Sequence, residues 1–359
     1  MNSSMHLLLS GHDTIECAYY LALSEGCKFD YERLAVAKET MRLSKSRKPT
    51  LIKLGSEEFM LAAHGTGSGY PFLIENEAFS IQFGEFNVPS FFVTFRSIVL
   101  WHSSAQGLHN RFLAWAHSIG LHAYQPEKLS RVDFTFDYYL PVIDFDEDNF
   151  VSSFTKDNQH RKHGKVQTFR LGEGDLGLRI YNKCDEIQES SQKTWFYELW
   201  GMEQNVWRIE WQVRKQWLRL VGIRTFEELE ERQGNLLRLL VNDHTTLRIK
   251  SDDSNRSRWP LHPVWLDLQE RIKKMEGLDV VRELDMPVLL DQRMMFITIS
   301  LYGYMKRIAA IYSLQGKTLP ISLKQARAHL AVQLERIHDP LTWQTDVERR
   351  MTEMRMGEC

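Results

Sequence analysis

The chain has few cysteines, and its positive and negative charges nearly cancel. Among 359 residues there are four cysteines, Cys17, Cys27, Cys184 and Cys359, and no two of them stand in a C-x-x-C spacing. This usage predicts free thiols in a reducing, cytoplasmic setting. The formal net charge of −2 excludes a uniformly basic coat for nucleic acid. Any surface that binds DNA must therefore be a local patch.

A cationic leader and a long hydrophobic run are also missing. The first residues read MNSSMHLLLSGHDTIECAYYL, with no cluster of Lys or Arg and only a three-leucine run before Ser10. A signal peptide needs a charged start followed by an apolar stretch, and a membrane-spanning helix needs about 20 apolar residues. The expectation is a cytoplasmic protein with no membrane partner.

What is present is the composition of an ordinary globular protein, with 43% hydrophobic and 26% charged residues. This length allows two or three domains with cores of their own. Strand patterns dominate up to residue 224 and helical spacing dominates after it, which predicts an α+β protein. We expect an antiparallel sheet with helices packed on one face, in a form that can be pseudo-duplicated, followed by an all-helical C-terminal region. The predicted domains are residues 1–110, 111–224 and 225–359.

The segment from Lys165 to Lys183, KVQTFRLGEGDLGLRIYNK, has the pattern of a β-hairpin. Two stretches rich in β-branched and aromatic residues flank a glycine-rich turn. Alternation along the second stretch places Leu178 and Ile180 on one face and Arg179 and Tyr181 on the other. If the aliphatic pair is buried, the phenol and the guanidinium share the solvent side.

Tyr181 is the candidate nucleophile. A free tyrosine has a pKa near 10, so attack on a phosphodiester requires help in forming the phenolate. Arg179 and Lys183 flank Tyr181 with positive charge, which lowers the cost of the phenolate and neutralises charge on a phosphate. Tyrosine is also a common structural residue in strands, so this interpretation depends on what else converges there.

Two further strand patterns carry carboxylates. RVDFTFDYY, residues 131–139, places Asp133 and Asp137 opposite an apolar face, and NVWRIEWQVR, residues 205–214, aligns Arg208 and Glu210. If these strands neighbour the Tyr181 strand, Asp133, Glu210 and Asp137 can converge on one Mg²⁺ or Mn²⁺ ion, because hard divalent ions prefer oxygen ligands. The alternative is a half-exposed sheet whose polar face meets water.

These three motifs, in this order, resemble those of the replication initiation factor family of rolling-circle plasmid and phage initiators and related relaxases of integrative conjugative elements. That family has an Arg-x-Asp strand, a glycine-containing turn before an Arg-Ile-Tyr strand, and an Arg-x-Glu strand. The resemblance covers residues 90–225 and implies a DNA-nicking enzyme of the HUH-endonuclease type on an HUH/RRM-like plan. It implies Tyr181 as nucleophile, with Asp133 and Glu210 at the acidic positions.

The chain departs from the family at two points. Asn182 stands where the family often has Asp, and no His-hydrophobic-His triplet, the metal-binding motif of HUH enzymes, occurs in the sequence. Members of this branch are similar in lacking the triplet, with carboxylates in its place. The resemblance therefore still implies a carboxylate-bound Mg²⁺ or Mn²⁺ ion.

The predicted function is nicking of origin DNA, in a single-stranded or hairpin region, by tyrosine attack. The products would be a 5′-phosphotyrosine bond and a free 3′-OH. Arg179, Lys183 and Arg208 would stabilise phosphate charge, and Glu186 would orient its neighbours. A host helicase and a second copy of the chain are expected partners. Two alternatives are a metal-dependent nuclease that activates water, and a DNA-binding regulator without catalysis.

Overall fold

The chain divides into two compact units in a computed structural model. The structure describes residues 5–44, 48–154, 157–162, 165–274, 286–316 and 320–355. The first unit comprises Met1–Glu283 with Met354–Cys359, and the second comprises Leu284–Glu353. The first unit holds every predicted site residue, and the division falls at residue 284, whereas the sequence pattern places a boundary at 225.

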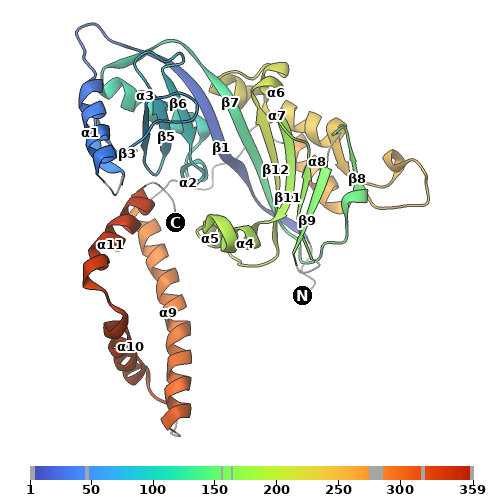
Figure 1. Cartoon of the computed structure of the whole chain (residues 1–359). Coiled ribbons are helices and arrows are strands. Elements are labelled where there is room, and N and C mark those ends of the chain that lie inside the picture. The colour runs from blue at the N-terminus through green and yellow to red at the C-terminus, as the bar shows by residue number, and fades with distance from the viewer. Residues whose placement is uncertain are drawn as a thin grey trace. The chain divides into compact units, whose positions relative to one another are not determined.

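An eleven-stranded antiparallel sheet forms the first unit, in the order β2-β3-β4-β5-β6-β1-β7-β12-β11-β10-β9. The strands are β1 (His6–Leu23), β2 (Thr50–Leu54), β3 (Glu57–Leu61), β4 (Phe72–Glu75), β5 (Phe79–Phe83), β6 (Phe91–Phe95), β7 (Leu121–Tyr139), β9 (Asp157–Lys162), β10 (Lys165–Leu171), β11 (Leu176–Asn182) and β12 (Val206–Arg214). The long strands β1 and β7 pair in the middle of the sheet (Figure 1). Each half of the sheet is therefore built from one continuous part of the sequence.

Several helices of the first unit begin at a side chain that caps them. The described helices of this unit are α1 (Tyr31–Leu43), α2 (Ser97–Leu100), α3 (Ala105–Ser118), α4 (Lys183–Glu186), α5 (Phe196–Trp200), α6 (Lys215–Leu220), α7 (Phe226–Leu239) and α8 (Pro263–Lys273). Among these, α2, α5 and α6 have no side-chain cap. Asp30 accepts a hydrogen bond from the Arg33 backbone at the start of α1, and Thr225 forms a capping box with Glu228 at the start of α7. Asp and Thr directly ahead of helical spacing are typical N-caps, so the sequence alone predicts both caps.

The two faces of the sheet are covered by different helices. On the apolar face, Phe79 packs against Phe112 of α3, Phe95 packs against Phe226 of α7, and the Tyr138 hydroxyl donates to Asp267 of α8. On the polar face, the short helices α2 and α5 lie against β1, and the rings of Trp101, which follows α2, and Phe196 of α5 lie over the Arg208 guanidinium of β12. The polar face is therefore buried, and a half-exposed sheet meeting water is wrong for this part of the chain.

The sequence also predicts a helix around Phe150, between the Asp133 strand and the Tyr181 hairpin, and this helix is not formed. The segment contains one 3₁₀ turn, Glu147–Asn149, followed by the short strand β8 (Phe150–Ser152). Asp146 and Asn149 cap the start of this turn reciprocally, and the turn ends at Phe150, whose backbone is extended and leads into the strand. β8 then pairs with β13 (Thr245–Leu247) in a separate two-stranded sheet.

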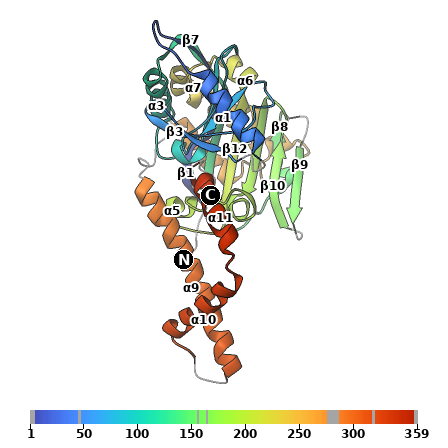
Figure 2. The same ribbon diagram turned by 60° about the vertical axis from the view of Figure 1, so that its left-hand side comes forward.

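In the described residues of the second unit, all regular secondary structure is helical. It contains α9 (Met286–Gly316), α10 (Leu323–Ile337) and α11 (Pro340–Arg355), seen in orange and red in Figures 1 and 2. The predicted α+β class, with an antiparallel sheet and an all-helical C-terminal region, is confirmed. Among the residues that the structure describes, no helix has both the length and the apolar character to cross a membrane.

Candidate active site

The register of three neighbouring strands, β7, β12 and β11, brings the predicted strand residues onto one face of the sheet. In β11 and β12, Arg179 lies opposite Glu210 and Tyr181 lies opposite Arg208. Arg208 in turn lies opposite Asp137 in β7. Side chains opposite each other on one face are in contact range, and diagonal neighbours are within reach of long side chains. The hairpin predicted around Tyr181 is confirmed, with Gly172 and Gly174 at positive φ in its turn.

The Tyr181 phenol contacts the carboxylate of Glu210. Its hydroxyl donates a hydrogen bond to Glu210 Oε2 at 2.8 Å. The other oxygen, Glu210 Oε1, pairs with Arg179 Nη2. The Arg179 guanidinium also lies 5.6 Å from the centre of the Tyr181 ring. Glu210 thus connects the candidate nucleophile to a cation whose side chain is 44% exposed.

A cleft of about 310 Å³ opens beside this contact. Its lining combines cations with carboxylates: Asp13, His160, Gln167, Thr168, Arg179, Tyr181, Asn182, Lys183, Asp185, Glu186, Glu189, Ser190, Lys193 and Glu210. Of the predicted site residues, Tyr181, Arg179, Lys183, Glu186 and Glu210 line this cleft. Asp133, Asp137 and Arg208 do not line it.

Tyr181 is more buried than the alternation of its strand predicts, since that pattern places it on the solvent side. Leu178 and Ile180 are buried as expected, but Tyr181 is only 8% exposed, because α4 follows β11 directly and folds over its end. Burial, followed by the charge of Glu210, raises the pKa of Tyr181 well above its ordinary value, although Arg208 and Arg179 act in the opposite direction. Neighbouring arginines therefore favour the phenolate, as expected, but burial and the charge of Glu210 outweigh them. The phenol needs an acceptor for its proton, and Glu210 is in contact with it.

Arg208 and Asp137 form a fully buried ion pair beneath the cleft. Arg208 Nε and Nη2 donate to the two oxygens of Asp137 at 2.6 and 2.8 Å, and Trp200 Nε1 donates to Asp137 Oδ2 at 3.0 Å. Arg208 Nη1 reaches Asp13 Oδ1 at 2.7 Å. Both oxygens of Asp137 accept hydrogen bonds, so this carboxylate fixes the position of Arg208 beneath the cleft.

Asp13 is a site residue that the motifs did not identify. It contacts Ser97 Oγ at 2.8 Å and Lys193 Nζ at 3.4 Å in addition to Arg208. Burial acts to raise the pKa of Asp13, but Lys193 and Arg208 outweigh it and hold this pKa well below its usual range. Asp13 stands at a register shift between β1 and β7, where a bulge turns its side chain to the polar face. The sequence signal was an Asp inside a strand, the same signal that identified Asp133.

Lys183 and Glu186 pair within one turn of α4. Lys183 Nζ donates to Glu186 Oε2 at 2.5 Å, and Ser191 Oγ donates to the same oxygen at 3.0 Å. The Lys183 ammonium lies 5.6 Å from the centre of the Tyr181 ring. Burial, followed by repulsion from Arg208, lowers the pKa of Lys183. A buried ammonium of lowered pKa gives up a proton more readily than an exposed one.

Asp133 is held by an arginine of its own strand. Arg131 Nε and Nη2 donate to the two Asp133 oxygens at 2.9 and 2.5 Å. Burial raises the pKa of Asp133 to about 6, against the opposing effect of Arg131. Asp133 therefore retains a proton in the folded protein at a pH where the unfolded chain has lost it.

This raised pKa predicts a pH-dependent loss of stability. Between about pH 4 and about pH 6 the folded state binds the Asp133 proton and the unfolded state does not, so the free energy of unfolding falls as the pH rises. A shift of about two units corresponds to about 3 kcal/mol. Urea titrations across this range should show the decrease in the wild type relative to Asp133→Asn. Exposed Asp252→Asn is the control, and parallel curves for wild type and Asp133→Asn would contradict the assignment.

The residues present do not fit a preformed divalent-ion site. In the described ranges no group of three His, Cys, Asp or Glu side chains is placed to hold a metal. Asp133 is bound by Arg131, Asp137 by Arg208, and Glu210 by Arg179. A hard cation would have to displace these arginines from the oxygens it needs. The Mg²⁺ or Mn²⁺ requirement stays a prediction, and no chemical step is derived through such an ion.

Comparisons with known proteins add a distant likeness. No family model matches the chain, and no curated protein matches it. Among solved structures, the chain is similar to the rolling circle replication initiator protein from Geobacillus stearothermophilus, with 19% sequence identity, a TM-score of 0.46, and coverage of 78% of this chain and 100% of that chain.

Proposed function

We propose that this protein nicks DNA at a replication origin by attack of Tyr181 on a phosphodiester, as a rolling-circle initiator or relaxase does. The observation that carries the proposal is the contact between the Tyr181 hydroxyl and Glu210, at 2.8 Å, in a cleft lined by Arg179, Lys183 and Lys193. A phenol, a proton acceptor and cations for a phosphate are the groups that covalent phosphoryl transfer requires.

The proposed reaction uses these side chains in turn. Arg179, Lys183 and Lys193 bind the non-bridging oxygens of the scissile phosphate, since cations stabilise the charge that develops there. The Tyr181 oxygen attacks phosphorus while its proton passes to Glu210. The P–O3′ bond breaks, and the leaving oxygen takes a proton from Lys183 to become a free 3′-OH. The 5′-phosphate remains on Tyr181 and preserves the bond energy for rejoining.

Arg179 has a second role in this scheme. While it pairs with Glu210 it reduces the basicity of that carboxylate, because a neighbouring cation favours the ionised form. When Arg179 moves to a phosphate, Glu210 becomes a better acceptor for the Tyr181 proton. Substrate binding would therefore activate the nucleophile, even though burial keeps the free enzyme's phenol protonated.

The direct test is a search for a covalent adduct. Full-length protein is incubated with single-stranded oligonucleotides tiled across the element that encodes it, with and without Mn²⁺, and analysed on a denaturing gel. A DNA–protein adduct that maps to Tyr181 supports the proposal. Cleavage without an adduct would favour the hydrolytic nuclease, and binding without cleavage would favour the regulator. Comparison of the two arms also tests the predicted metal requirement, whereas a helicase partner and a homodimer stay predictions.

Glu210→Gln should slow adduct formation by about 10²- to 10⁴-fold, the usual contribution of a general base. The amide preserves the shape of the side chain but cannot accept the Tyr181 proton. Single-turnover kinetics on a cleavable oligonucleotide would measure the change. Asp185→Asn, in the same cleft but without a described contact to Tyr181, is the matched control. Equal rates for Glu210→Gln and wild type would remove Glu210 from the mechanism.

A further inference from the structure

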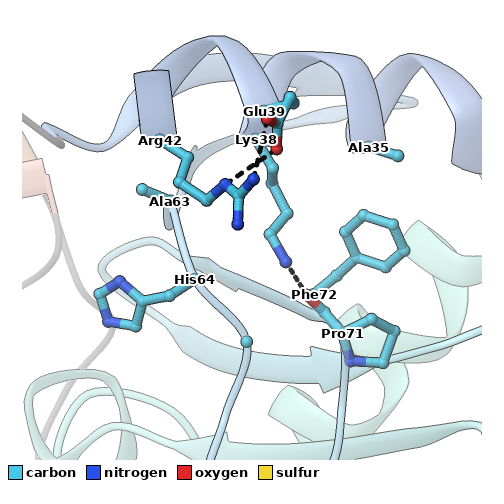
Figure 3. A pocket seen from close by; sticks show the side chains of 9 residues that line it. Ala35, Lys38, Glu39, Arg42, Ala63, His64, Pro71 and Phe72 are labelled. Atoms are coloured by element: carbon cyan, nitrogen blue, oxygen red, sulfur yellow. Dashed lines mark hydrogen bonds and ion pairs between the residues drawn. The ribbon is translucent and has the colours of Figure 1, made fainter. Parts of the chain in front are cut away.

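A second cleft lies in the first unit, on the other half of the sheet. It measures about 520 Å³ and lies between α1 and the segment that joins β3 to β4 (Figure 3). Its lining consists of Ala35, Lys38, Glu39, Arg42, Ala63, His64, Gly65, Pro71 and Phe72. We call this the α1 cleft. It shares no lining residue with the cleft beside Tyr181.

Lys38 lies in the α1 cleft, and its ammonium has N–H donors available for a ligand. Its ammonium lies 5.1 Å from the centre of the Phe72 ring and donates to the Pro71 carbonyl. Figure 3 shows the side chain extending from α1 toward Phe72 and Pro71. An ammonium has three donors, and Pro71 engages one. Burial lowers the pKa of Lys38, so a bound anion would compensate for a desolvation cost already present.

Arg42 provides a second cation one turn further along α1. Residues four apart share a helix face, which places Arg42 beside Lys38. Arg42 pairs with Glu39 through Nε and Nη2, both at 3.0 Å. This pair is exposed and three residues apart, so it contributes well under about 1 kcal/mol and can yield to a ligand. Glu39 is the single carboxylate in the lining, so Lys38 and Arg42 leave the cleft with a net positive charge.

Opposite α1, the cleft wall is formed by short side chains and backbone. Ala63, Gly65 and Pro71 line it together with the exposed His64. Small side chains leave room for a bulky ligand, and His64 adds a ring nitrogen that can hydrogen-bond to an oxygen. The cleft is open, polar and cationic, and it has an aromatic ring in its floor. These are the features of sites that hold a nucleic-acid backbone.

We propose that the α1 cleft binds a backbone phosphate of DNA through Lys38 and Arg42, away from the site of nicking. The α1 cleft borders Phe72, whose ring lies on the sheet face opposite to that of Tyr181. This inference therefore rests on the proposed function only in that both clefts would bind DNA. With a net charge of −2, the chain needs local cationic sites to hold DNA. A contact remote from Tyr181 would add affinity and orientation without taking part in the reaction.

The test measures DNA binding in a Tyr181→Phe background, so that cleavage cannot interfere. Fluorescence anisotropy with a labelled duplex and a labelled single strand of the same random sequence gives the affinity at several salt concentrations. Lys38→Gln with Arg42→Gln should weaken binding about tenfold at low salt and reduce the salt slope by about 0.9 per lost phosphate contact. The matched control is Arg33→Gln with Lys53→Gln, two exposed cations outside the cleft. It should change neither quantity appreciably.

Three results would overturn the inference. The first is no change of DNA affinity in the cleft variant, and the second is an equal loss of affinity in the control variant. The third comes from a parallel titration with inorganic phosphate, in which the cleft variant loses phosphate binding but keeps its DNA affinity. The last result would assign the cleft to a free anion. Because anisotropy does not depend on nicking, the inference can stand if no Tyr181 adduct forms. It can equally fail while the adduct forms, so the two proposals are separable.

Discussion

Tyr181→Phe is expected to form no covalent adduct with any origin oligonucleotide while binding DNA nearly as well as the wild type. The substitution removes one oxygen atom, and that atom is the proposed nucleophile. Loss of the nucleophile from a covalent catalyst reduces the rate by a factor on the order of 10⁶. A denaturing gel measures the adduct, and anisotropy on the same oligonucleotides measures binding.

The matched control is Tyr138→Phe. Tyr138 is also a buried tyrosine of the same sheet whose hydroxyl donates to a carboxylate, Asp267, at 2.9 Å. It faces the opposite side, so its loss costs a comparable hydrogen bond, about 1 kcal/mol, without touching the cleft. Tyr138→Phe should retain adduct formation. Retained adduct in Tyr181→Phe would refute the proposed nucleophile, and loss of DNA binding in that variant would mean that Tyr181 is structural.

Arg208→Ala is expected to destabilise the first unit by about 3 to 5 kcal/mol. This is the usual cost of removing one partner from a buried ion pair, because it leaves uncompensated charge in the interior. Here Asp137 would lose both guanidinium contacts and Asp13 would lose one. Arg208 is also fully buried between Trp101 and Phe196, so the truncation opens a cavity. Urea denaturation followed by tryptophan fluorescence would measure the change.

Arg42→Ala supplies the contrast for this prediction. It breaks the exposed pair with Glu39 and should cost less than about 1 kcal/mol. A second comparison is Arg208→Leu combined with Asp137→Leu, which removes both charges. It should be less destabilised than Arg208→Ala, since replacement of a whole buried pair by apolar residues is often close to neutral. An Arg208→Ala protein as stable as Arg42→Ala would contradict the buried network.

The sequence determined the elements of the site and the face on which they lie. Period-two alternation in residues 131–139 and 205–214, and the glycine turn before Tyr181, predict three strands whose polar side chains share a face. The caps at Asp30 and Thr225 follow from local hydrogen bonding that needs no tertiary partner. The α+β class follows from the same local patterns. These features depend on residues close together in the chain.

Partner choice and burial were decided by the tertiary structure. The register between strands places Arg179 opposite Glu210 and Arg208 opposite Asp137. These carboxylates therefore pair with arginines, whereas the motifs suggested that they share a metal ion. The bulge that turns Asp13 into the site arises from pairing between strands more than 100 residues apart. The helix α4, which follows β11 and packs on its end, buries Tyr181, and this burial raises the pKa of Tyr181. Solvation and charge at a side chain depend on what packs over it, and the alternation of a single strand carries no information about that neighbour.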